Sequence, residues 1–143
     1  MVFICPGGGY EFVSHKEGEP LALQFTAMGY HAAVLTSSVK PAVYPTQLLE
    51  IAQAWKIIRE NADRWNVLTD KIIIMGGSAG GHLAASYGIF SGVDFIATLH
   101  AASPEEAVGR PQVQALQVRG ALHVLVWLKG RAEPGQVREV RFL

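Results

Sequence analysis

The chain has 143 residues, which is enough for one domain with a single hydrophobic core. Half of the residues are hydrophobic and 17% are charged, and the formal net charge is zero, so the chain offers no electrostatic attraction to nucleic acid or to an anionic membrane surface. No apolar run reaches the roughly 20 residues that span a bilayer, and the N-terminus carries no basic stretch before a long apolar one, so we expect a cytoplasmic protein.

Short apolar runs alternate with helical patterns over the first hundred residues, an arrangement typical of a parallel sheet with crossover helices. The first run, Val2–Cys5, ends in the lone cysteine, which we interpret as a small buried side chain rather than a reactive thiol. A proline near the start and a glycine at the end predict a short helix over Glu19–Gly29. Three further strands are predicted at His31–Thr36, Lys71–Met75 and Asp94–Leu99.

A longer helical pattern runs from about Pro45 to Trp65. Its apolar residues recur every three to four positions, so one face should pack on the sheet. These residues are Leu48, Ile51, Ala52, Trp55, Ile58 and Ala62. After Gly109 the composition shifts toward arginine, glutamine and valine, and only Ala121–Leu128 resembles a further buried strand. We therefore predict a core over residues 1–103 and a divergent tail over 104–143 that adds one strand to the same domain.

The segment Ile72–Ala85 predicts a strand, a tight turn and a helix in succession, with Gly76-x-Ser78-x-Gly80 at the turn. This pattern is typical of a nucleophile elbow, in which the serine occupies a strained turn and the glycines let strand and helix approach each other. Ser78 is therefore the candidate nucleophile. The N-terminus of the following helix directs its dipole and free N–H groups toward negative charge that develops during acyl transfer.

A second glycine cluster, Pro6–Tyr10, follows the first strand. Glycine permits backbone angles that turn N–H groups toward a reacting carbonyl, so we assign the N–H groups of Gly8, Gly9 and Ala79 to an oxyanion hole. Neither cluster fits the G-x-G-x-x-G or G-x-x-x-x-G-K-[ST] spacing, which argues against a nucleotide-binding loop.

Together these motifs resemble esterases and lipases of the α/β-hydrolase superfamily, in the hormone-sensitive-lipase-like and acetylxylan-esterase-like group. The motifs are Pro6–Tyr10, Tyr44-Pro45 and Gly76–Ala85. The resemblance implies a three-layer α/β sandwich with a mostly parallel sheet, here incomplete. It also implies hydrolysis of short acyl or acetyl esters, including esters on carbohydrate, through an acyl-Ser78 intermediate with no metal or organic cofactor.

The acid that should follow the serine is not evident in this chain. In such enzymes the acid and then the histidine stand on loops after later strands. Asp94, the one aspartate after Ser78, opens a predicted strand and should lie at the opposite edge of the sheet. Glu105 is the candidate acid, with Glu106 as its alternative, although both come one strand early.

The base is equally open. His82 lies one helical turn after Ser78, where we expect it to pack or to form a local hydrogen bond. His100 ends a predicted strand at the correct edge, and His123 lies in a segment that resembles the family strand before the histidine loop, so either is a candidate base. In that resemblance the base should follow the strand, but the sequence there is Arg131–Pro134.

Three explanations of this gap are open: truncation or a frame shift after about residue 103, a rearranged triad that uses His100 or His123, and a partner chain that supplies the missing half. The gap also favours a second class of function, a noncatalytic remnant or binding module.

We expect Tyr10 and His15 to contact a small ester substrate, with His15 at the entrance to the substrate site or on the surface. A sheet of four or five strands would expose edges that favour a homo-oligomer.

Overall fold

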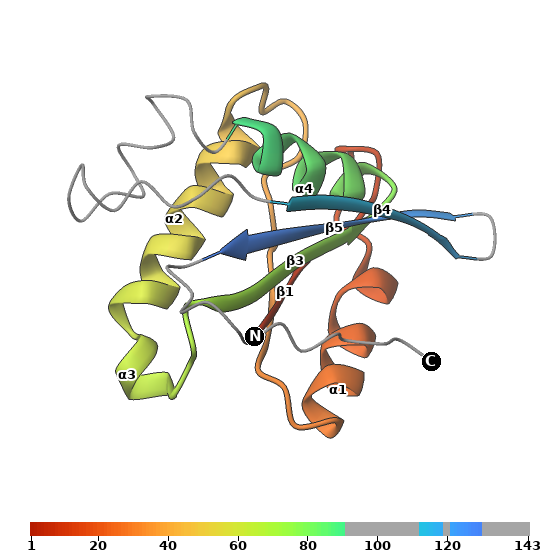
Figure 1. The fold of residues 1–143 in the computed structure, drawn as a ribbon. Helices are drawn as coiled ribbons and strands as arrows, with labels where there is room; N and C mark the ends of the chain where they lie inside the picture. The colour runs from red at the N-terminus through yellow and green to blue at the C-terminus, as the bar shows by residue number, and fades with distance from the viewer. Residues whose placement is uncertain (91–111, 119–120, 130–143) are drawn as a thin grey trace.

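The structure, a computed structural model, describes residues 1–90, 112–118 and 121–129. One sheet runs through the described part of the chain, with strand order β2-β1-β3-β5-β4 (Figure 1). The strands are β1 Val2–Cys5, β2 Ala32–Val34, β3 Lys71–Gly77, β4 Gln112–Val118 and β5 Ala121–Lys129. The predicted strand Asp94–Leu99 and the predicted boundary at residue 103 lie outside the described residues.

Strand β1 is flanked on both sides by parallel strands. Its last residue, Cys5, pairs with Gly76 of β3, so β1 and β3 end together at one edge of the sheet. The α/β architecture with a parallel β2-β1-β3 unit is therefore confirmed. The register also places the glycine loop after β1 beside the serine turn after β3, which is the arrangement that the candidate site requires.

The other side of the sheet is an antiparallel hairpin. The strand predicted at Ala121–Leu128 is confirmed as β5, which runs antiparallel to β3. Strand β4, which the sequence did not predict, pairs with β5 from Gln112 opposite Trp127 to Val118 opposite Ala121. The sheet thus combines three parallel strands with a two-stranded antiparallel addition.

Helices cover both faces of the parallel part. They are α1 Glu19–Ala27, α2 Thr46–Glu60, α3 Ala62–Trp65 and α4 Ala79–Phe90, with the 3-10 helix η1 at His15–Glu17. Side chains of β1 alternate between the faces: Val2 and Ile4 pack with Phe25 of α1, whereas Phe3 and Cys5 pack with α2 and α4. This alternation confirms the predicted three layers. No helix within the described ranges is long and apolar enough to cross a membrane.

The predicted helix over residues 45–65 is two helices. The break falls at Asn61, whose side-chain Nδ2 donates to the Ile57 carbonyl at 2.9 Å, and Asn66 ends α3 in the left-handed conformation at φ 54°. The predicted stripe is otherwise confirmed, because its first five members are buried in α2 and only Ala62, now in α3, is half-buried. Cys5 is also buried, as predicted.

Candidate active site

The strand, turn and helix predicted around Ser78 are present. β3 ends at Gly77, α4 begins at Ala79, and Ser78 between them is exposed with φ 51°. For a residue with a Cβ this left-handed conformation costs about 1–2 kcal/mol, so the surrounding packing must hold it. The hydrogen bond from the His82 N–H to the Ser78 carbonyl, at 3.0 Å, is the first of the helix. The serine hydroxyl thus stands between the end of a strand and the start of a helix.

The two glycines of the motif are required by close packing. A Cβ on Gly80 would lie 1.9 Å from the Cys5 carbonyl oxygen, and a Cβ on Gly76 would lie 2.3 Å from the Gly80 backbone. Real Cβ atoms do not approach other heavy atoms this closely, because van der Waals repulsion rises steeply below ordinary contact. The Gly76-x-Ser78-x-Gly80 spacing therefore lets α4 start directly against the end of β1.

The glycine loop lies against the same turn. A Cβ on Gly7 would be 3.0 Å from the Ser78 Cβ and 2.7 Å from the Gly77 carbonyl oxygen. The next three residues all have positive φ: Gly8 at 128°, Gly9 at 65° and Tyr10 at 60°. Such angles turn successive peptide groups sharply and suit glycine. The loop therefore folds tightly against the serine turn.

The hydrogen bonds within the glycine loop engage the Gly8 carbonyl but not the N–H groups of Gly8 and Gly9. The Gly8 carbonyl accepts from Glu11 at 3.0 Å and from Phe12 at 3.2 Å. No hydrogen bond within the described residues engages the N–H groups of Gly8 and Gly9. Ala79 is the first residue of α4, where a backbone N–H has no partner inside the helix. All three predicted oxyanion donors thus stand on segments that border Ser78.

Tyr10 connects the loop to the helix that follows the serine. Its hydroxyl and Nδ1 of His82 form a hydrogen bond of 2.8 Å, and the two rings meet edge to face with centroids 6.0 Å apart. Burial, with a smaller effect of nearby Cys5, raises the pKa of Tyr10 above its ordinary value, so the phenol stays protonated at neutral pH. His82 thus forms a hydrogen bond, as expected, but its partner is Tyr10 on the glycine loop and not a neighbour on its own helix.

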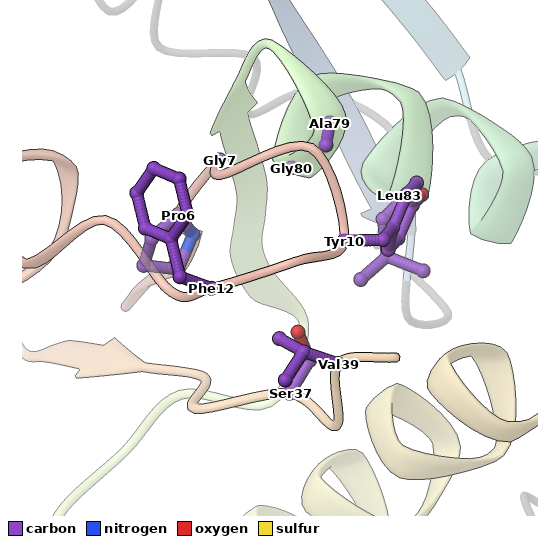
Figure 2. A pocket seen from close by; sticks show the side chains of 9 residues that line it. All are labelled: Pro6, Gly7, Tyr10, Phe12, Ser37, Val39, Ala79, Gly80 and Leu83. Atoms are coloured by element: carbon purple, nitrogen blue, oxygen red, sulfur yellow. The ribbon is translucent and has the colours of Figure 1, made fainter. Parts of the chain in front are cut away.

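Two hollows border this arrangement. The first is a small depression between the glycine loop, the start of α4 and the segment after β2 (Figure 2). It is lined by Pro6, Gly7, Tyr10, Phe12, Ser37, Val39, Ala79, Gly80 and Leu83. The second, of about 230 Å³, lies between α4 and the start of α2 and shares Leu83 with the first. Tyr10 thus lines a hollow next to the serine turn.

Of the remaining predicted site residues, some lie in the described part of the chain and others do not. His15 is exposed in η1 and lines neither hollow. The backbone of His123 in β5 pairs with Gly77, one residue before the serine. His100 and Glu105, like the alternative acids, lie outside the described residues. Within the described ranges no three His, Cys, Asp or Glu side chains gather in a way that could hold a metal ion.

One site residue was missed by the sequence reasoning. The carboxylate of Glu17 accepts the Gly7 N–H at 2.7 Å, and Oε2 lies 2.6 Å from the point that a Gly7 Cβ would occupy. Glu17 comes ten positions after Gly7, in a polar stretch without motif or periodicity, so only the folded loop reveals the contact.

The three layers and the strained serine turn at the strand edge define a chain of the α/β-hydrolase class. The comparison with protein-family models is more specific. The chain belongs to the BD-FAE family, whose model matches residues 1–131.

Two curated proteins are similar to part of the chain. Endo-1,4-beta-xylanase B of Butyrivibrio fibrisolvens is 36% identical over 92 residues, which is 62% of this chain and 14% of that protein. The acetylxylan esterase of Xylanibacter ruminicola is 31% identical over 81 residues, which is 56% of this chain and 17% of that protein. The chain therefore spans less than a fifth of either relative.

Solved structures agree on the fold. A carboxylesterase, Cest-2923, from Lactobacillus plantarum WCFS1 superposes with a TM-score of 0.63 at 32% identity and covers 69% of this chain. An acetyl ester-xyloside bifunctional hydrolase from Caldicellulosiruptor lactoaceticus gives a TM-score of 0.59 at 36% identity and covers 61%. The aligned part is 37% of the first structure and 32% of the second, so this chain corresponds to about a third of each.

Proposed function

We propose that this chain carries the nucleophile and the oxyanion hole of a serine carboxylic ester hydrolase. The observation that carries the proposal is Ser78 itself, an exposed serine held at φ 51° at the end of β3 and bordered by the glycine loop. A strained turn of this kind presents a hydroxyl away from the sheet, where a substrate can reach it.

In the proposed reaction, Ser78 Oγ attacks the ester carbonyl carbon while a base accepts the hydroxyl proton. The carbonyl electron pair moves onto oxygen, and the N–H groups of Gly8, Gly9 and Ala79 stabilise that charge. Each such donor contributes roughly a hundredfold to a thousandfold in rate. Collapse of the intermediate breaks the bond to the alkoxy oxygen, which accepts the proton from the base and leaves as the alcohol. Water then gives a proton to the base and attacks the acyl carbon, and Ser78 Oγ takes that proton as the carboxylic acid is released.

The proposed substrates are short acyl or acetyl esters, including acetyl groups on carbohydrate. Support comes from two similar proteins, an acetylxylan esterase and an acetyl ester-xyloside bifunctional hydrolase. We propose no metal or organic cofactor, because the acyl-serine route requires none.

A fluorophosphonate probe with an intact-mass readout tests the nucleophile. We expect one probe per chain in the wild-type protein and none in Ser78→Ala. Ser86→Ala, which removes a half-buried serine from α4, is the matched control and should label like the wild type. A folded wild-type protein that takes up no probe would contradict the proposal.

The base requires a separate experiment. Turnover of 4-nitrophenyl acetate should fall by several orders of magnitude in whichever of His100→Ala and His123→Ala removes it, since losing the base of a serine–histidine pair costs roughly a millionfold. His31→Ala, which removes an exposed histidine before β2, is the control. The pairing of His123 with Gly77 makes His123 the first variant to test.

The second candidate function is a binding module that keeps the site without turnover. The observation that favours it is the hydrogen bond of His82 with Tyr10, because no histidine in residues 1–90 is hydrogen-bonded to Ser78. Probe labelling at Ser78 separates the two readings. Stoichiometric labelling supports the hydrolase, whereas an unlabelled chain that binds acetylated xylo-oligosaccharide in calorimetry supports the binding module.

A further inference from the structure

A closed circuit of hydrogen bonds holds the glycine loop, and Glu17 completes it. The Gly7 carbonyl accepts from the Ser14 N–H at 2.9 Å, the Ser14 carbonyl accepts from the Glu17 N–H at 3.0 Å, and the Glu17 carboxylate accepts from the Gly7 N–H at 2.7 Å. Hydrogen bonds to a charged acceptor are about twice as strong as neutral ones. The bond to Glu17 is the one charged connection in this circuit.

The circuit sets the direction of the proposed oxyanion donors. Because a trans peptide is planar, its N–H points opposite to the carbonyl of the preceding residue. Ser14 fixes the Gly7 carbonyl and therefore the Gly8 N–H. Glu11 and Phe12 fix the Gly8 carbonyl and therefore the Gly9 N–H. Glu17 fixes the peptide group between Pro6 and Gly7 through the Gly7 N–H. The peptide groups on both sides of the Gly7 α-carbon are therefore fixed by hydrogen bonds.

The packing around Glu17 and Gly18 favours the hydrogen bond between the Glu17 carboxylate and the Gly7 N–H. Gly7 is buried and Glu17 is half-buried, so the bond is partly shielded from water. After Glu17 the chain passes through Gly18, where a Cβ would lie 2.9 Å from the Val34 side chain and 3.2 Å from the Pro6 ring. Gly18 thus lets the end of η1 pack directly against Pro6, at the foot of the loop that Glu17 holds.

We propose that Glu17 is a positioning residue for the oxyanion hole. Its carboxylate accepts a hydrogen bond from the Gly7 N–H and so fixes the conformation of the loop. In this conformation the N–H groups of Gly8 and Gly9 form no hydrogen bond within the loop and can donate to an oxyanion. The inference rests on the proposed hydrolase function, because the value of this orientation lies in stabilising the oxyanion. Glu17 itself does not contact the reacting atoms in this role.

Labelling kinetics with the fluorophosphonate probe test the consequence. The probe's phosphoryl oxygen occupies the position of the oxyanion, so its reaction rate depends on correctly placed donors. We expect labelling to slow about a hundredfold in Glu17→Ala, since a displacement of about 1 Å costs that much. Glu17→Gln keeps an acceptor without the charge and should slow labelling about tenfold. Glu19→Gln, on an exposed neighbour in α1, should label like the wild type.

Amide NMR spectra of the wild type and the same variants test the geometry without needing reactivity. In the wild type the Gly7 amide proton should resonate downfield, as expected for a donor to a carboxylate, and it should move upfield in Glu17→Gln. The amides of Gly8 and Gly9 should shift and exchange faster with solvent in Glu17→Ala, but not in Glu19→Gln.

The outcomes separate the two claims. If the folded wild type takes up no probe, the hydrolase proposal fails, and the spectra alone decide whether Glu17 orients the loop. Unchanged Gly8 and Gly9 amides in Glu17→Ala would overturn the inference. A Glu17→Ala protein that loses only thermal stability and labels at the wild-type rate would overturn it as well, because Glu17 would then be a structural residue alone.

Discussion

The serine turn at residues 76–80 and the glycine loop at residues 6–10 lie side by side at one edge of the sheet, yet Gly9 of the loop serves a different physical need from Gly76 and Gly80 of the turn. Gly76 and Gly80 have ordinary backbone angles and no room for a Cβ. Gly9 has a left-handed φ of 65° and open space around the position of a Cβ. The serine turn therefore depends on packing, whereas this part of the loop depends on backbone conformation.

The backbone conformation of a reactive centre can therefore be maintained in two ways, by steric packing or by hydrogen bonds. In the serine turn a strained residue, Ser78, is held by packed backbone on both sides, so the strain is maintained by sterics. At Gly9 the φ angle is one that glycine adopts freely, and the hydrogen bonds that the preceding Gly8 carbonyl accepts hold this peptide group. We expect substitutions at the turn to affect the free energy of unfolding strongly and substitutions at Gly9 to affect it weakly.

The largest expected effect is that of Gly80→Ala. The new Cβ would lie 1.9 Å from the Cys5 carbonyl oxygen and 2.6 Å from the Pro6 carbonyl oxygen, and backbone atoms cannot move aside singly. We expect a loss of about 3 kcal/mol or more in the free energy of unfolding, measured by urea denaturation. Loss of less than about 1 kcal/mol would mean that β1 and α4 separate easily, and the packing account of the turn would be wrong.

The next effect concerns Cys5, whose backbone supports both turns. Burial raises the pKa of its thiol from the ordinary value of 9.0 to about 12. Above pH 9 the unfolded chain therefore releases a proton that the folded chain keeps. The stabilisation is complete below pH 9 and is lost toward pH 12, at up to about 1.4 kcal/mol per pH unit.

Urea denaturation at several pH values between 8 and 11 measures this effect. Burial also raises the pKa values of Tyr10 and Tyr87, so other groups contribute to the alkaline loss. Cys5→Ala retains those contributions and should show the shallower dependence on pH. Equal slopes in the two proteins would indicate that the thiol reaches solvent without unfolding.

Much of the site could be predicted from the sequence because its signals are local. The Gly76-x-Ser78-x-Gly80 spacing, the strand before it and the helix after it lie within fourteen residues. The spacing of apolar residues likewise predicted the buried face of α2. Such features depend on residues that are near in sequence, so a pattern can report them.

Features that depend on distant residues were missed. The contact of Glu17 with Gly7 exists only once the loop has closed, and no spacing rule encodes it. The antiparallel pairing of β5 with β3 joins residues about fifty positions apart, and β4 has glutamine at every second or third position, which weakens the strand signal. The break at Asn61 depends on side-chain hydrogen bonding that competes with the helix.

A smaller effect, of opposite sign, is expected for Ser78→Gly. Removing the Cβ at φ 51° relieves about 1–2 kcal/mol of strain, and the added freedom of the unfolded chain offsets about 0.5–1 kcal/mol of that. We expect a net gain of roughly 0.5–1 kcal/mol in stability together with complete loss of probe labelling. Ser78→Ala keeps the strain and should lose labelling without this gain. Destabilisation by Ser78→Gly would show that the hydroxyl itself stabilises the turn.

An effect of the same size as that of Ser78→Gly, but a loss, is expected for Gly9→Ala, the counterpart of Gly80→Ala in the loop. The new Cβ meets no atom within 4 Å, so only the left-handed conformation costs free energy. That cost, about 1–2 kcal/mol, is partly offset because alanine restricts the unfolded chain, which leaves a net loss of roughly 0.5–1 kcal/mol. Gly29→Ala is the matched control, since Gly29 also has positive φ, at 86°, and open space, but stands after α1. If Gly9→Ala costs several times more than Gly29→Ala, Gly9 is held by packing as the serine turn is, and the contrast between Gly9 and the turn fails.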